Sequence, residues 1–326
     1  MKNKAFTAAL GMLGLITALF ALTLSGCTDT PREPLRIASS PWPGYEPLYL
    51  ARDLGYFAKE RVRLFELPSA DVTLEAFRNR STDMASLTLD ETLSLIDDGY
   101  RVRILLVMDV SNGGDAVLAR PGIKALPDIK GKNIAIVNIP LGLYMLNRTL
   151  DKAGLKRSDV TVFSMPETQQ TKFYRDGKAD VVITYEPMKS ELEKDGAHVL
   201  FDSSQIPNEI FDILVIHEDV YQQHRDDACY VARQWFKTLA YMQQHPQDAG
   251  QRIGKRLGVS VADYEQMARG ITLPGRQDNK RILGGDKPEL LGPAERLSDI
   301  MREEQQISAP VDTRSAIDPG FAACFD

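Results

Sequence analysis

Cysteine, histidine and tryptophan are scarce in this sequence, whose 326 residues include three, four and two of them respectively. The histidines (His198, His217, His224 and His245) are scattered along the chain and do not combine with cysteine at the spacing of a zinc site. We also find no nucleophile elbow, P-loop or dinucleotide-binding fingerprint. The sequence therefore predicts no metal, no cofactor and no enzymatic activity, and it favours surface or packing roles for the histidines.

An excess of positive charge is also lacking. The chain has 39 Lys and Arg against 45 Asp and Glu, which gives a net charge of −6. Without Lys2 and Lys4 it has 37 basic and 45 acidic residues, a net charge of −8. Basic patches are the usual footprint of phosphate binding. We therefore expect no nucleic-acid partner.

The amino terminus has the pattern of an export signal. Lys2 and Lys4 give a basic head, Phe6 to Leu24 are nearly all apolar, and Ser25-Gly26-Cys27 resembles a bacterial lipobox. We expect residues 1–26 to be a signal peptide, Cys27 to carry lipid, and residues 27–34 to be a polar tether. An uncleaved membrane anchor is the alternative. The lipid would hold the protein on the bacterial cell membrane, facing the periplasm or the cell exterior.

Two cysteines remain once Cys27 is lipidated. Cys229 and Cys324 are an even pair, and an exported protein folds where disulfides persist. Sequence separation does not say whether their Cα atoms come close enough to bond. The sequence leaves open whether they form a disulfide that holds the tail.

Between residues 35 and 217, short β-like runs alternate with helical patterns, which is typical of α/β sheets covered by helices. A mature chain of about 300 residues exceeds the usual domain size, so we expect two lobes. The apolar run Phe211 to His217 would carry the chain back to the first lobe, and the chain beyond Tyr221 reads as helical or irregular. The expected division is a first lobe of residues 35–115 plus 217–326 and a second lobe of residues 116–216.

Several segments resemble successive landmarks of the NMT1/THI5-like solute-binding proteins, which include nitrate-, sulfonate-, taurine- and thiamin-pyrimidine-binding members. The resemblance covers about residues 35–216. It rests on the order and spacing of these segments, because no single motif is specific. The matching segments are Trp42-Pro43-Gly44-Tyr45-Glu46-Pro47, Leu54-Gly55-Tyr56-Phe57, Asp83-Met84-Ala85, Gly131-Lys132-Asn133-Ile134-Ala135, Leu150 to Leu155, Ala179-Asp180-Val181-Val182 and Tyr185-Glu186-Pro187.

The resemblance implies a type II periplasmic-binding fold, with two α/β lobes joined by a hinge and a ligand in the cleft between them. It also implies a small-molecule ligand and an ABC permease as partner. We expect a monomer. A sensing lipoprotein that presents its ligand to a membrane receptor kinase or cyclase is an alternative that the sequence does not exclude.

Candidate ligand-binding residues follow predicted strands or lie at predicted helix starts, where open α/β sheets bind ligands. Each also has a structural explanation: the aromatics could pack the rim between the lobes, Thr88 and Asp90 could cap a helix, and Asn112-Gly113 could be a plain loop. Tyr185 stands where the family usually has tryptophan. The candidates are Trp42, Tyr45, Glu46, Thr88, Asp90, Asn112, Gly113, Asn138, Leu141, Tyr185 and Glu186.

The expected cleft is acidic. Glu46, Asp90, Asp115 and Glu186 lie at predicted helix starts or turns, and no Lys or Arg lies inside the same motifs. Uncompensated carboxylates would repel an anion, so the sequence favours a small nitrogen-bearing ligand, pyrimidine- or amine-like. An anion such as nitrate or a sulfonate is the alternative, because helix starts attract anions and each acid could simply cap its helix.

Overall fold

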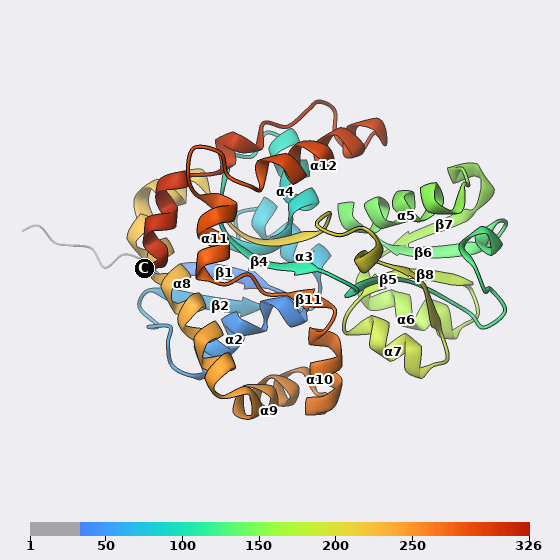
Figure 1. Cartoon of the computed structure of the whole chain (residues 1–326), viewed down its shortest axis with the longest axis horizontal. Coiled ribbons are helices and arrows are strands. Elements are labelled where there is room, and N and C mark those ends of the chain that lie inside the picture. Colours follow the sequence, from blue (N-terminus) through green and yellow to red (C-terminus); the bar gives the residue numbers. More distant parts are fainter. Residues whose placement is uncertain (1–32) are drawn as a thin grey trace, which may run out of the picture. The chain divides into compact units, whose positions relative to one another are not determined.

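The computed structural model describes residues 33–326, of which Pro34–Asp326 form one unit. Two β-sheets organise this unit (Figure 1). The predicted signal peptide, the lipidation site at Cys27 and nearly all of the tether lie outside the described residues. We call each sheet with its covering helices a lobe.

The first lobe contains a mixed six-stranded sheet in the order β11-β4-β10-β3-β1-β2. Strands β1, β2 and β3 are parallel, while β10 runs antiparallel to both β3 and β4. The strands are β1 (Leu35–Ser39), β2 (Val62–Glu66), β3 (Met84–Thr88), β4 (Val102–Ser111), β10 (Phe211–His217) and the short β11 (Ile271–Thr272). Helices α2 (Glu46–Asp53), α3 (Ala70–Arg78) and α4 (Leu89–Asp97) connect the first four strands.

The second lobe contains a five-stranded sheet in the order β7-β6-β8-β5-β9. Its strands are β5 (Asp115–Ala119), β6 (Asn133–Val137), β7 (Thr161–Met165), β8 (Val181–Tyr185) and β9 (His198–Asp202). Helices α5 (Pro140–Ala153), α6 (Glu167–Arg175) and α7 (Met188–Lys194) follow β6, β7 and β8. The two-lobed α/β fold expected from the sequence is confirmed.

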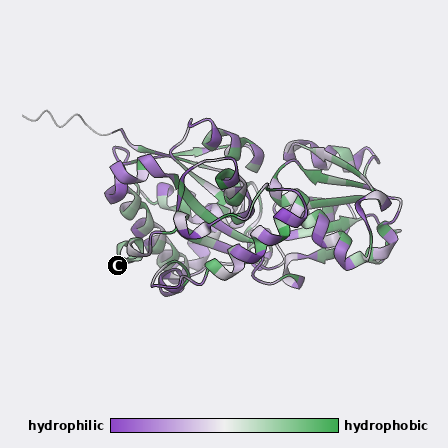
Figure 2. Cartoon of the chain, turned by 90° about the horizontal axis from the view of Figure 1, so that it is seen from above, coloured by the Kyte–Doolittle hydropathy of each residue, from purple (hydrophilic) through white to green (hydrophobic). Residues whose placement is uncertain are grey.

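The burial of the strands explains why their sequences differ. Strands β3, β5, β8 and β10 are buried at every residue and lie inside the sheets, whereas the edge strands β2 and β7 expose several side chains. Interior strands covered on both faces read as continuous apolar runs. Figure 2 shows the strands as largely hydrophobic and the helices as mixed.

Two short segments connect the lobes. The first joins β4 to β5 through residues 112–114, and the second joins β9 to β10 through residues 203–210. Ser203 ties them together, because its Oγ lies 2.7 Å from Ser111 Oγ and accepts a hydrogen bond of 2.6 Å from Gly113 N. Strand β10 pairs inside the six-stranded sheet. The chain has therefore returned to the first lobe before Phe211, earlier than the boundary at residue 217 that we expected.

The C-terminal part packs on the first lobe. It comprises α8 (Glu218–Gln244), α9 (Pro246–Leu257), α10 (Val261–Ala268), α11 (Arg276–Leu283) and α12 (Leu291–Glu303). Helix α8 lies against α2 and β4, and a disulfide joins its Cys229 to Cys324 in the final 3-10 turn. The strand β11, which we did not expect beyond Tyr221, pairs with the end of β4.

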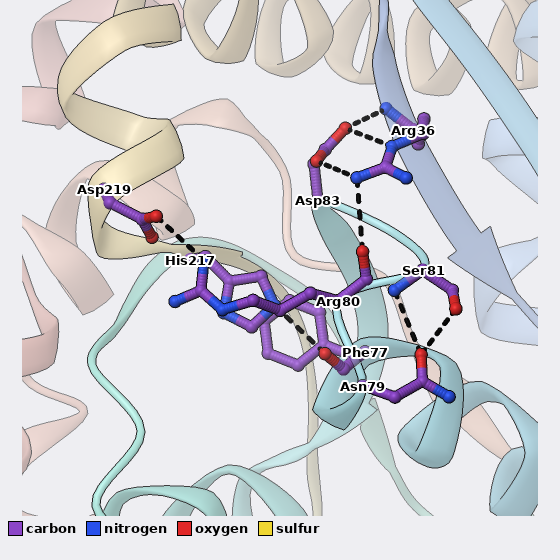
Figure 3. A network of polar contacts seen from close by, with 8 residues as sticks. All are labelled: Arg36, Phe77, Asn79, Arg80, Ser81, Asp83, His217 and Asp219. Atoms are coloured by element: carbon purple, nitrogen blue, oxygen red, sulfur yellow. Dashed lines mark hydrogen bonds and ion pairs between the residues drawn. The ribbon is translucent and has the colours of Figure 1, made fainter.

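A polar network secures the first lobe where β3 begins and β10 ends (Figure 3). The Asp83 carboxylate accepts three hydrogen bonds from Arg36, and Arg80 pairs with Asp219 at 2.8 Å. The His217 ring stacks on Phe77 with centroids 3.9 Å apart, so this histidine has a packing role.

Candidate functional site

A pocket lies where the ends of strands from both lobes meet the starts of helices. Its cavity is small in this structure, with a volume of about 20 Å³. The first lobe contributes lining residues from the turn after β1, the start of α3, the end of β3, α4 and the start of β10. From the second come β5, the start of α5 and the end of β8. The lining residues are Ser40, Pro41, Trp42, Tyr45, Ala70, Ser86, Thr88, Glu91, Asp115, Ile139, Leu141, Tyr185 and Asp212.

Aromatic side chains form one wall of the pocket. Trp42 of the first lobe meets Tyr185 of the second edge to face, with centroids 6.0 Å apart at 87°. Trp42 Nε1 donates a hydrogen bond of 2.9 Å to Asp109 Oδ2, and the hydroxyl of Tyr45 donates to Asp212 Oδ1. Because both polar tips are bonded to carboxylates, the orientation of the rings is fixed.

Gly44 permits this arrangement. A Cβ atom at this position would overlap both the Asp109 carboxylate and the Trp42 indole nitrogen. The turn therefore needs glycine for close approach. Substitution here would displace the two groups that hold the aromatic wall.

Carboxyl groups dominate the polar part of the site. Glu91, Asp115 and Asp212 line the pocket and are 1%, 2% and 3% exposed. Asp109 and Asp90 are buried beside them. Within residues 33–326, no hydrogen-bond partner is found for Glu91 Oε1, Asp115 Oδ2, Asp109 Oδ1 or Asp90 Oδ2. No Lys or Arg of the described chain lines the pocket.

Burial changes the acidity of these groups. Desolvation, reinforced by repulsion from Asp90, raises the pKa of Glu91 to about 8. Desolvation also raises the pKa of Asp115 to about 7, and a hydrogen bond from Ser111 only partly offsets it. An uncompensated carboxylate away from water binds its proton more tightly. Both groups therefore ionise near neutral pH and not near pH 4.

Asp109 and Asp212 are a facing pair in the register of β4 and β10. The pKa of each is raised, chiefly by desolvation, and for Asp212 also by repulsion from its partner. Two carboxyl groups held this close do not both ionise readily. The pair therefore holds a proton at the end of the pocket formed by the first lobe.

Comparison with known proteins identifies the family to which the chain belongs. The model of the family described as NMT1/THI5 like matches residues 42–249, more than half of the chain. The chain belongs to the NMT1/THI5-like family. This assignment confirms the resemblance predicted from the sequence.

Proteins similar to this NMT1/THI5-like protein in sequence or in fold include binding proteins and an enzyme. It is 21% identical over 282 residues to the taurine-binding periplasmic protein of Escherichia coli strain K12, covering 81% of this chain and 85% of that protein. The alkanesulfonate-binding protein SsuA from Xanthomonas axonopodis pv. citri, bound to MOPS, has a TM-score of 0.74 at 16% identity and covers 88% and 99% of the two chains. A mutant of the desulfurization enzyme DSZB, in complex with biphenyl-2-sulfinic acid, has a TM-score of 0.64 at 15% identity, covering 90% of this chain and 98% of that chain. The periplasmic-binding fold is thus shared by binding proteins and an enzyme.

Five predicted site residues line the pocket of this NMT1/THI5-like protein, namely Trp42, Tyr45, Thr88, Leu141 and Tyr185. Thr88 also caps α4, where its backbone N–H donates to Glu91 Oε2 and Glu91 N donates to its hydroxyl. Both explanations considered for Thr88 therefore apply to its position.

Six predicted residues do not line the pocket: Glu46, Asp90, Asn112, Gly113, Asn138 and Glu186. Glu46 is ion-paired with Arg256, whose Nε donates to Glu46 Oε2 at 2.6 Å. Asn138 lines a separate cavity, and its Oδ1 accepts from Ser164 at 3.0 Å. Glu186 accepts from Ser190 N at 3.1 Å.

Asn112 and Gly113 are part of the first connecting segment. Asn112 N donates to Gly270 O at 2.8 Å, and Gly113 donates to Ser203. Both residues therefore lie in a segment that joins the lobes and outside the pocket lining. Asp90 is buried next to Glu91 and acts on the site through its charge.

Sequence reasoning missed several lining residues, and Asp212 is the most informative. It is an isolated acid inside the apolar strand Phe211–His217, as Asp109 is inside Val102–Ser111. Burying a carboxyl group in an apolar strand costs free energy of folding, so its presence there suggests a functional role. That signal could have identified both.

Within the described range, no group of His, Cys, Asp and Glu has the arrangement of a metal site. In the same residues, no helix is both long and apolar enough to span a membrane.

Proposed function

We propose that this protein is an extracytoplasmic solute-binding protein whose pocket captures a small nitrogen-bearing cation or a neutral molecule rich in N–H donors. The pocket itself carries the proposal: buried carboxyl oxygens lack partners around it, and no basic side chain of residues 33–326 lines it. Buried polar groups without partners cost free energy. A ligand that donates to them would recover this cost.

The ligand chemistry follows from the walls. Glu91 Oε1 and Asp115 Oδ2 are free acceptors, and both carboxyl groups are buried enough to bind a cation without much competition from water. Trp42 and Tyr185 supply aromatic surface, which attracts a cationic or planar nitrogen group. An amidine, a guanidinium or an aminopyrimidine combines these features.

A second candidate is a sulfonate, favoured by the relatives named for taurine and alkanesulfonates. Helix α5 also begins at the pocket with Ile139 and Leu141, and helix starts attract anions. A zwitterion that carries both an ammonium and a sulfonate would satisfy both features. A simple sulfonate would meet three carboxyl groups of the pocket lining, to which no Lys or Arg of residues 33–326 contributes.

For the export route and the partner, we propose lipidation at Cys27 and delivery to an ABC permease. The lipobox-like sequence supports the lipid, and the family assignment supports an importer. The alternative partner is a membrane receptor that binds the closed, ligand-bound state of the protein. Neighbouring genes distinguish them: permease and ATPase genes favour uptake, whereas a lone receptor gene favours sensing.

The test is a thermal-shift screen of the purified protein against methylguanidinium, small amines, aminopyrimidines, methanesulfonate, taurine and nitrate. A ligand at a hundredfold its Kd stabilises the folded state by about 2.7 kcal/mol. We expect hits among the nitrogen compounds, and loss of those hits in Asp115→Asn but not in Asp286→Asn at an exposed site. Hits confined to methanesulfonate and nitrate would contradict the proposal.

A further inference from the structure

Glu167, in the first turn of α6, bonds to both lobes at the rim of the pocket. Its Oε2 accepts a hydrogen bond of 3.1 Å from Ala70 N in the first lobe. The same oxygen accepts one of 2.5 Å from the hydroxyl of Tyr185 in the second lobe. Ala70 and Tyr185 both line the pocket. One carboxylate oxygen therefore links a lining residue of the first lobe to a lining residue of the second.

The Ala70 end of this contact is the start of α3. Ser69, the N-cap residue, makes no side-chain capping hydrogen bond. The first N–H groups of a helix lack partners within the helix and attract anions. At α3 the anion is supplied by the opposite lobe, because Glu167 caps a helix to which it does not belong.

We propose that Glu167 is a specificity-determining residue, which occupies with its own carboxylate the place at the start of α3 that an anionic group of a ligand would take. It thereby keeps anions out of the pocket and helps to hold the lobes closed. This inference rests on the proposed function. It explains how a fold shared with sulfonate-binding proteins can host a ligand of opposite charge.

The pocket provides independent support for a ligand beside this contact. Glu91 Oε1 and Asp115 Oδ2 have no hydrogen-bond partner among the described residues, and their side chains belong to residues that are only 1% and 2% exposed. With Glu167 in place, every acidic group around the pocket favours a cation. Without Glu167, the backbone N–H of Ala70 at the start of α3 loses its acceptor beside the pocket.

Two other contacts between the lobes lie away from the pocket lining. Asn147 donates to Glu304 at 2.5 Å, and Lys194 pairs with Asp263 at 3.0 Å. None of these four residues lines the pocket. They provide matched controls, because changing them weakens contact between the lobes without freeing the start of α3.

The experiment compares Glu167→Ala, Glu167→Gln and the control Glu304→Gln by calorimetry with methanesulfonate and methylguanidinium at pH 8. We expect Glu167→Ala to bind methanesulfonate at least tenfold more tightly than the unmodified protein and methylguanidinium at least fivefold more weakly. Glu167→Gln keeps hydrogen-bonding capacity without the charge, so we expect the same directions with smaller changes. Small-angle scattering should show less compaction on methylguanidinium binding in both, whereas Glu304→Gln should keep the original ligand preference.

Unchanged methanesulfonate affinity in both folded Glu167 variants would overturn the inference, as would an equal gain in Glu304→Gln. Failure of the unmodified protein to bind any nitrogen compound contradicts the proposed function instead. Because the anion readout compares variants with the unmodified protein, the two failures remain distinguishable. Circular dichroism of each variant establishes folding before binding is compared.

Discussion

Replacing Asp115 with asparagine should stabilise the ligand-free protein while removing its ligand binding. Asparagine has nearly the same shape and cannot ionise. Asp115 is 2% exposed, and one of its carboxyl oxygens has no partner in the described part of the chain. Above neutral pH the native protein must hold this carboxylate charged and desolvated. Sites built for ligands commonly reduce stability in this way.

The size of the effect follows from the pKa. Burial raises the pKa of Asp115 from 3.8 to about 7, so the folded protein binds this proton more tightly than the unfolded chain does. The stability contribution of the protonated group is therefore fully present below pH 3.8 and is lost as the pH rises through about 7. At about 1.4 kcal/mol per pKa unit, the cost at pH 8 reaches about 4 kcal/mol as an upper bound.

Urea unfolding from pH 4 to pH 8 measures this effect. The stability advantage of Asp115→Asn should be near zero at pH 4, grow with pH and level off above about pH 7. Asp286→Asn, at an exposed site, serves as the control and should show no such trend. An asparagine variant that is less stable at pH 8, or equally shifted at every pH, would refute the reasoning.

Three further changes test the supporting structure. Arg256→Ala leaves the buried Glu46 carboxylate without its partner and should lower the free energy of unfolding by about 3–5 kcal/mol, measured by urea unfolding. Cys324→Ser removes the disulfide with Cys229, which closes a loop with a sequence separation of 95, and should lower the free energy of unfolding by about 2–5 kcal/mol in the same assay. Equal stability of the oxidised and reduced native proteins would contradict this expectation. Trp42→Phe keeps an aromatic ring but removes the indole N–H donor, and calorimetry should show about tenfold weaker ligand binding; unchanged affinity would mean the indole hydrogen bond is dispensable.

Much of the fold could be predicted from the sequence because its strands are short apolar runs separated by clear helix starts and stops. Thr88 and Glu91 have the spacing of a capping box, and the structure has that box. Gly154 ends α5 in the left-handed conformation. The run Phe211 to His217 was expected to carry the chain back to the first lobe, and as β10 it pairs inside that lobe's sheet, so residues 211–216 belong there and not to the second lobe.

The aromatic part of the site could also be predicted, since Trp42 and Tyr45 follow β1 directly. In its acidic part, Asp115 could be predicted from its place in a turn after β4. Asp109 and Asp212 could not, because they meet only through the antiparallel register of β4 and β10, about a hundred residues apart in sequence. Glu46 was a reasonable candidate at a helix start, but Arg256 from α9 neutralises it. Long-range partners decide whether a buried acid serves a ligand or the fold.

The measurement that tests the central claim most directly is calorimetric titration of the purified protein with methylguanidinium and methanesulfonate at pH 8 and pH 6. The account predicts methylguanidinium binding with proton release, from Glu91 at pH 8 and from both Glu91 and Asp115 at pH 6. It also predicts affinity at least tenfold weaker at pH 6, because the ionised fraction of Asp115 falls about tenfold over that range. Methanesulfonate binding that is tighter than methylguanidinium binding, and that strengthens at pH 6 as the carboxyl groups become protonated, would contradict it.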